Sequence, residues 1–130
     1  MQDRPTALEL LEAVRGFLER DVVPVLEGPR RFHALVAANV LAIVARELDG
    51  EEDRLAAEWR RLAPLVGEAG PPPSGLAALR GAVREATAAL ADRIRRGDAD
   101  DGPFRDATRR AVRETVVEKL RVANPRFLGS

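Results

Sequence analysis

The sequence predicts an all-α fold: a single-domain bundle of four to five helices around one central apolar helix at about residues 30–48. Apolar residues recur at helical spacing in five segments joined by short connections. No run of β-branched residues alternates with polar ones, so no segment is typical of a strand. A chain of 130 residues can bury one core without disulfides or metals, which favours one domain over residues 1–130.

The first predicted helix begins after Thr6, which can form a capping box with Glu9. Pro24 removes a backbone donor, so we expect this segment to kink or restart there before Gly28-Pro29 ends it. Its apolar positions are Leu10, Leu11, Val14, Phe17 and Leu18.

The central stretch, RFHALVAANVLAIVAREL at residues 31–48, is the most apolar helical segment of the chain. At about 100° per residue, its large apolar side chains cover more than half of the helix circumference. A helix of this kind is expected in the middle of a fold, covered by its neighbours. The residues that predict this are Phe32, Leu35, Val36, Val40, Leu41, Ile43, Val44 and Leu48.

Three further segments complete the predicted bundle. Glu51, Glu52 and Asp53 suit the start of a third helix, which Pro64 kinks or ends. Residues 67–75, GEAGPPPSG, form a stiff proline- and glycine-rich linker, and Ser74 is the expected cap of the fourth helix. The fourth helix carries one narrow apolar stripe, which is compatible with a homodimer, and the last helix runs from about Pro103 to Val122.

Composition excludes several classes of protein. The 21 basic and 21 acidic residues leave no net charge to attract nucleic acid or an anionic membrane. No apolar run reaches the roughly 20 residues of a membrane span, and the first residues lack a signal-peptide pattern. The chain has no cysteine. We therefore expect a soluble, cytoplasmic protein.

No constellation of residues predicts catalysis, and we expect neither an enzyme, a cofactor nor a metal. His33 is the only histidine and has no spacing typical of a metal site. Ser74 and Ser130 lie in the linker and at the last position, away from a base. Arg105, Arg109 and Arg113 form a row that interleaved carboxylates make typical of a solvated, salt-bridged face.

A small set of polar residues departs from the usual placement of charged and polar side chains in helices. Arg30 and Arg31, next to His33, place positive charge at a helix start, against its dipole. Asn39 lies on the central apolar face, and Arg46 falls within about 20° of it. Lys119 lies on the apolar side of the last helix.

We predict a buried polar cluster of Asn39, Arg46, Glu47 and Lys119, in which Glu47 pairs with Lys119. Asn124 and Arg126 would close the cluster. Two interpretations stay open: the cluster fixes helix register, or it is a site for a small ligand or a partner.

Three blocks of sequence resemble a bacterial family of small proteins classed as a domain of unknown function. The blocks are RPTALELLEAVRGFLE, RFHALVAANVLAIVAREL and EKLRVANPRFL. Members of this family are often encoded beside a kinase-like protein similar to aminoglycoside phosphotransferases and beside acyl-CoA dehydrogenases. The resemblance implies an accessory role with a partner of either kind, and it implies no catalytic residue.

Two functions are therefore expected. The first is a non-enzymatic accessory or interaction protein with an exposed apolar patch. The alternative is a helical bundle that binds a small anionic ligand, with Arg30, Arg31 and His33 at a helix start receiving a phosphate or carboxylate.

Overall fold

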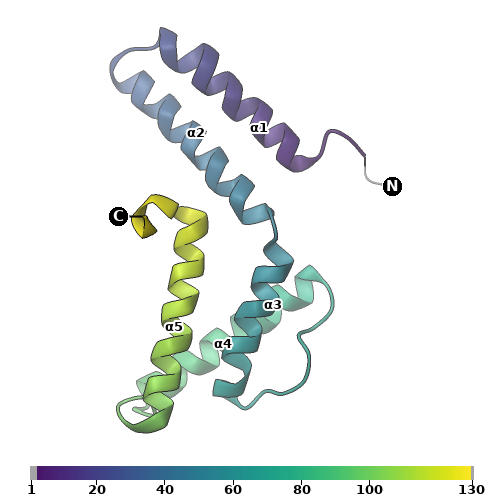
Figure 1. Ribbon diagram of the computed structural model, residues 1–130, viewed down its shortest axis with the longest axis vertical. Helices are drawn as coiled ribbons and strands as arrows, with labels where there is room; N and C mark the ends of the chain where they lie inside the picture. Colours follow the sequence, from purple (N-terminus) through teal and green to yellow (C-terminus); the bar gives the residue numbers. More distant parts are fainter. Residues whose placement is uncertain (1–2, 130) are drawn as a thin grey trace. The chain divides into compact units, whose positions relative to one another are not determined.

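The computed structural model describes residues 3–129, which form five α-helices and no β-strand (Figure 1). The predicted all-α fold is confirmed. The chain divides into two compact units: the first holds the residues up to Gly50 together with Val122–Arg126, and the second holds Glu51–Arg121 and the residues from Phe127. Residues 67–75 lie within the second unit, so the boundary between units falls at Gly50 and not at the proline-rich linker. The single domain stays a prediction.

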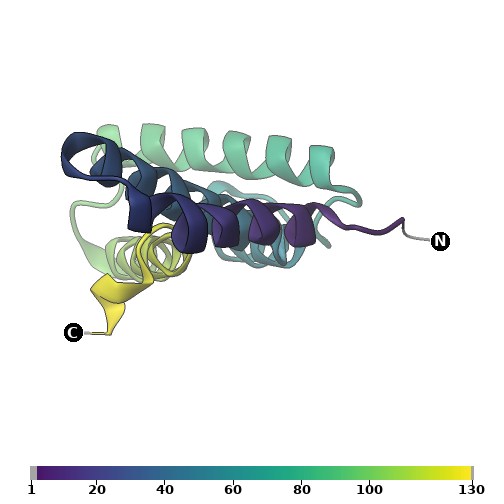
Figure 2. The same ribbon diagram turned by 90° about the horizontal axis from the view of Figure 1, so that it is seen from above.

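The first unit is built on a helical hairpin of α1 (Ala7–Phe17) and α2 (Gly28–Leu48). The predicted capping box is confirmed: Glu9 N donates to Thr6 Oγ1 at 3.2 Å, and Thr6 N donates to Glu9 Oε2 at 2.8 Å. After Phe17 the chain widens into a π turn, Leu18–Val22, and then tightens into a 3-10 turn, Val23–Val25, that contains Pro24. These turns reverse the chain, so that α2 runs back along α1 (Figures 1 and 2).

The expectation that residues 30–48 form the buried centre of the core is wrong. Ala38 is the one buried residue of α2, whereas Phe32, Val36 and Val40 are 64%, 44% and 49% exposed. The large apolar side chains of α2 cover more than half of the helix circumference, so a single neighbouring helix can cover only part of them.

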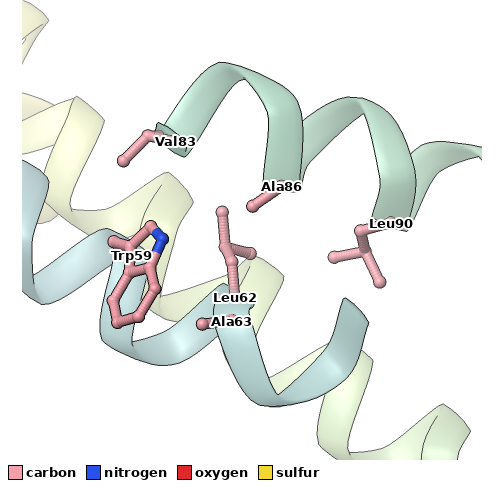
Figure 3. Packing of buried hydrophobic residues seen from close by; sticks show 6 residues of the cluster. All are labelled: Trp59, Leu62, Ala63, Val83, Ala86 and Leu90. Atoms are coloured by element: carbon pink, nitrogen blue, oxygen red, sulfur yellow. The ribbon is translucent and has the colours of Figure 1, made fainter. Parts of the chain in front are cut away.

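The largest core lies in the second unit, between α3 (Glu51–Leu62) with its following 3-10 turn (Ala63–Val66) and α4 (Leu76–Arg95). Side chains from the two segments face one another (Figure 3). Most of the stripe predicted on the fourth helix is buried here, whereas Ile94 at its end is 42% exposed. The homodimer stays a prediction. The core residues are Trp59, Leu62, Ala63, Val83, Ala86 and Leu90.

Glycine backbone conformations end α3 and begin α4. Gly67 has a φ of 80° and stops the turn after α3. Gly75, with a φ of 92°, precedes the first residue of α4, and no side chain caps this helix. The prediction that Ser74 is the cap is therefore wrong, because Gly75 occupies the cap position with a backbone conformation that favours glycine.

The last helix, α5 (Gly102–Ala123), is followed by a 3-10 turn, Pro125–Leu128. Within the second unit, α5 and α3 are joined by ion pairs of Arg61 with Glu114 at 3.9 Å and of Lys119 with Glu58 at 3.6 Å. From Val122 onward the end of α5 belongs to the first unit. One helix therefore contributes to both units.

Candidate functional site

A polar hollow with a volume of about 600 Å³ lies in the first unit. Four segments line it: α1, the π turn, α2 and the residues at the end of α5. We call it the first-unit hollow. Its lining residues are Arg15, Glu19, Leu35, Ala38, Asn39, Ala42, Arg46, Ala123, Asn124, Pro125 and Arg126.

The α2 wall of the hollow follows from helix geometry. Leu35, Asn39 and Arg46 are spaced so that, at about 100° per residue, they point to one side of α2. Ala38 and Ala42 lie on the same side, and their small side chains leave the space that larger residues would fill. An apolar floor with polar groups at its edge is typical of sites for small molecules.

Arg46 joins the α2 wall to the end of α5. Its Nε donates to the carbonyl oxygen of Val122 at 2.8 Å. This carbonyl belongs to the last turn of α5, where backbone acceptors lack helical partners and a cation suits the helix dipole. Pro125 prevents the helix from continuing, and the chain then turns so that Asn124 and Arg126 line the hollow.

The α1 wall is partly neutralised. Arg15 donates from Nη2 and Nε to the Glu12 carboxylate at 2.9 and 3.1 Å, and its Nη1 lies 3.9 Å from Glu19 Oε1. The hydrogen bond from Arg15 holds the pKa of Glu12 below its usual value, and the pKa of Arg15 is raised by the same contact. Arg46 and Arg126 are the other two cations of the lining.

Four of the residues selected from the sequence come together at this hollow: Asn39, Arg46, Asn124 and Arg126. The predicted alignment of Asn39 with Arg46 is present. However, the side chain of Asn39 is exposed and not buried, because the face of α2 that carries it opens onto the hollow. The predicted burial of this residue is wrong.

Lys119 differs from its prediction. Its side chain is 67% exposed and pairs with Glu58, whose own side chain is only 12% exposed. The prediction of a buried ammonium is therefore wrong: Lys119 is a solvated cation covering a half-buried carboxylate of α3. Glu47 is exposed and lies outside the lining of the first-unit hollow.

The predicted anion site at the start of α2 is not part of the hollow. Arg30, Arg31 and His33 lie exposed in the first two turns of α2, and none of them lines it. The ring of His33 lies 6.0 Å from that of Phe32, in a tilted arrangement. Arg31 points to the same side of α2 as Leu35, one turn before the hollow begins.

Sequence patterns missed Arg15 and Glu19, which line the hollow from the first segment. Arg15 is half-buried and Glu19 is exposed, and both occupy ordinary helix positions, so no local signal marked them. The sequence patterns also did not predict a second hollow, of about 380 Å³, which lies in the second unit. The row of Arg105, Arg109 and Arg113 lines it, and Arg105 pairs with its neighbour Asp106 at 3.3 Å.

Two searches over the described residues bear on the class of the protein. No group of three or more histidine, aspartate and glutamate side chains between residues 3 and 129 is arranged to hold a metal ion. In the same range, no helix combines the length and the apolar character needed to cross a membrane.

Comparisons with known proteins give one match. No curated protein and no solved structure matches the chain significantly. A family model described as "Domain of unknown function (DUF6285)" matches residues 24–127, which include α2 to α5 and every α2 and α5 residue of the first-unit hollow. The match contains the second of the three blocks that carry the resemblance and the third as far as Phe127, whereas the first block, residues 4–19, lies outside it. The chain belongs to the DUF6285 family, which confirms the resemblance to an uncharacterised family.

Proposed function

We propose that this protein is a non-enzymatic accessory protein that binds a protein partner through the apolar surface of its first unit. One observation carries this proposal: large apolar side chains of the first unit are between 43% and 76% exposed. Large apolar side chains that stay exposed in such number are typical of interaction sites. These residues are Leu10, Val14, Phe17, Val25, Phe32, Leu35, Val36, Val40 and Leu48.

The spacing of these residues supports helix-type recognition. Phe32, Val36 and Val40 recur every four residues and form one stripe along α2, which we call the α2 stripe. A stripe with this spacing suits an apolar groove or an amphipathic helix on a partner. The partner we propose is a phosphotransferase-like protein of the kind that the family resemblance implies, with an acyl-CoA dehydrogenase-like protein as the second choice.

The test is co-expression of the full chain with a phosphotransferase-like protein and, separately, with an acyl-CoA dehydrogenase-like protein from the same genome, followed by size-exclusion chromatography. Val36→Asp places a charge in the α2 stripe and should weaken the complex at least about tenfold, since burying an unpaired carboxylate is costly. Ala37→Asp adds the same charge at the next, also exposed, position, which points about 100° away. This control should leave the complex intact.

Three outcomes would contradict the proposal. The protein could elute alone in every combination. It could elute as a homodimer that Val36→Asp dissociates, in which case a second copy covers the stripe. Finally, Val36→Asp could lower the melting temperature well below that of Ala37→Asp, which would mean that the stripe packs within the chain.

The first-unit hollow favours a second function, the binding of a small anionic ligand. Two arginines and two asparagines that the sequence singled out lie around one apolar floor. A thermal-shift panel of carboxylates and phosphates on the full chain tests this function. No stabilisation by any anion beyond that of sodium chloride at equal ionic strength would count against it.

A further inference from the structure

The side chains of the first-unit hollow present many more hydrogen-bond donors than acceptors. A guanidinium has five N–H donors and no acceptor, and an asparagine amide has two donors and one acceptor oxygen. Arg46, Arg126, Asn39 and Asn124 contribute such groups, whereas Glu19 is the only carboxylate in the lining and already lies near Arg15. A ligand that complements this surface must be rich in acceptors.

Three of these donors are available without breaking a protein contact. Within residues 3–129, the side chains of Asn39, Asn124 and Arg126 make no hydrogen bond or ion pair, and all three are exposed. A ligand therefore has to displace only water, which costs less than competing with an existing ion pair.

Arg46 provides a fixed cation. It is half-buried, and its bond to the Val122 carbonyl oxygen at 2.8 Å sets the direction of its guanidinium plane. Attraction between charges strengthens as water is excluded, so a half-buried guanidinium attracts an anion more strongly than a fully solvated one. Planar guanidinium groups also match the paired oxygens of carboxylate and phosphate.

The floor of the hollow limits the rest of the ligand. Leu35, Ala38 and Ala42 offer apolar contact, and the volume of about 600 Å³ lies within the range of small-molecule sites. An anionic head at the arginines with a short apolar body over the alanines would satisfy both parts of the surface.

We infer that the first-unit hollow binds a small molecule with a carboxylate or phosphate head and a short apolar body. Arg126 and Arg46 hold the head, and the amides of Asn39 and Asn124 orient it. This inference rests on the second function proposed above and assigns it to particular residues.

The chain is well suited to a test by NMR. Asn39 and Asn124 are its only asparagines and Gln2 is its only glutamine, so three side-chain amide groups appear in a ¹⁵N correlation spectrum. The two asparagine amides report on the hollow, and the indole N–H of Trp59, the only tryptophan, serves as a control because Trp59 lies in the core of the second unit. The full chain is titrated with inorganic phosphate in one arm and butyrate in the other, against sodium chloride at equal ionic strength.

We expect saturable shifts of the Asn39 and Asn124 amides in at least one arm and none for the Trp59 indole N–H. The stronger arm identifies the head group. Arg126→Gln should weaken binding about tenfold, the effect of losing one charge-assisted contact. Arg95→Gln removes an arginine that is 74% exposed and lies outside the hollow, and it should change nothing.

The possible failures differ in meaning. If backbone amides elsewhere shift saturably and the side-chain amides of Asn39 and Asn124 do not, the assignment to this hollow is overturned, but anion binding by the protein is retained. If no amide signal shifts in either arm, both the assignment to this hollow and the second function are overturned. Asparagine shifts that Arg126→Gln leaves unchanged would overturn the role of Arg126. None of these results affects the partner-binding function, which Val36→Asp tests separately.

Discussion

The side chain of Arg93 contacts three other segments of the second unit. Its Nη1 donates to the carbonyl oxygen of Leu65 at 2.6 Å, its Nε donates to Asp98 Oδ2 at 2.9 Å, and its guanidinium carbon lies 3.9 Å from the ring centre of Phe104. By its position alone, Arg93 is a cation in the last turn of α4, where a positive charge suits the helix dipole. Its partners come from three other segments, so no local pattern could have predicted them.

Arg93→Ala should therefore lower the free energy of unfolding by about 2 kcal/mol, since a hydrogen bond to a partly buried carbonyl and a cation–π contact are lost. Arg95→Ala removes a cation from the same turn but leaves these contacts, and it should cost less than about 1 kcal/mol. Urea denaturation followed by Trp59 fluorescence compares the two. Equal losses would mean that Arg93 acts only through the helix dipole.

The contact of Arg93 with Asp98 also predicts a dependence on pH. The hydrogen bond from Arg93 holds the pKa of Asp98 below its ordinary value of 3.8, so the carboxylate stabilises the folded state when it is ionised. This stabilisation is complete above the unfolded pKa and is lost as the pH falls through the lower folded pKa. The difference in stability between the natural chain and Asp98→Asn should therefore be constant near neutral pH and shrink below about pH 4. Urea titrations at several pH values measure it, and a difference that grows in acid would contradict the assignment.

Thr108 carries a polar atom that the fold does not satisfy. The residue is 5% exposed, and its Oγ1 is buried without a hydrogen-bond partner within the described residues, beside the second-unit hollow. Thr108→Val keeps the shape and removes the unsatisfied group, so it should stabilise the protein by about 1 kcal/mol. Thr87→Val is the matched control, because Thr87 Oγ1 donates to the Val83 carbonyl oxygen at 2.7 Å, and it should change stability by less than about 0.5 kcal/mol. Destabilisation by Thr108→Val would reveal a water or ligand bound to this hydroxyl.

At the scale of the helices, sequence patterns correctly predicted the features that depend on residues close together in the chain. The capping box of Thr6 and Glu9 and the buried stripe of α4 are both present, because each depends on spacing within one helix. The burial of α2 was predicted wrongly, because a count of apolar residues does not say how many neighbours are available to cover them. The cap at Ser74 was wrong for a local reason, the positive φ of Gly75.

Replacing two glycines of the second unit by alanine should change the stability of the protein in opposite directions. Gly81 lies inside α4, and a Cβ added there would meet no atom within 4 Å. Gly81→Ala should therefore stabilise the protein by about 1 kcal/mol through helix propensity. Gly67 is equally uncrowded but has a φ of 80°, so Gly67→Ala should destabilise by about 1 kcal/mol or more. Thermal unfolding of both variants checks the signs, and the same sign for both would show that backbone conformation does not decide the outcome.

At the scale of the molecule, buried apolar side chains are concentrated in the second unit, whereas Val23 and Ala38 are the buried ones found in the described first unit. Backbone amides of α1 and α2 should therefore exchange with solvent at least about 100-fold faster than those of α4, after correction for intrinsic rates. Hydrogen exchange followed by mass spectrometry measures this difference. Equal protection throughout would show that both units open together.

The candidate site was predicted only in pieces. Asn39, Arg46, Asn124 and Arg126 could be selected because each breaks a local rule in a helix or at its end. That they line one hollow depends on the meeting of α2 with residues that follow some 70 positions later. Because the four residues lie far apart in the sequence, the sequence could not distinguish them from Lys119 and Glu47 as members of one site.

The contribution of Val122–Arg126 to the first unit has a consequence for synthesis of the chain. About 70 residues of the second unit separate α2 from this last wall of the hollow. At about 5–20 residues per second, the ribosome adds them in roughly 4 to 14 seconds. During that time the nascent hairpin lacks Asn124, Arg126 and the carbonyl that orients Arg46. Only a chain translated through Arg126 can therefore present the assembled hollow, and a chain arrested or clipped before Val122 would keep the apolar α2 stripe without it.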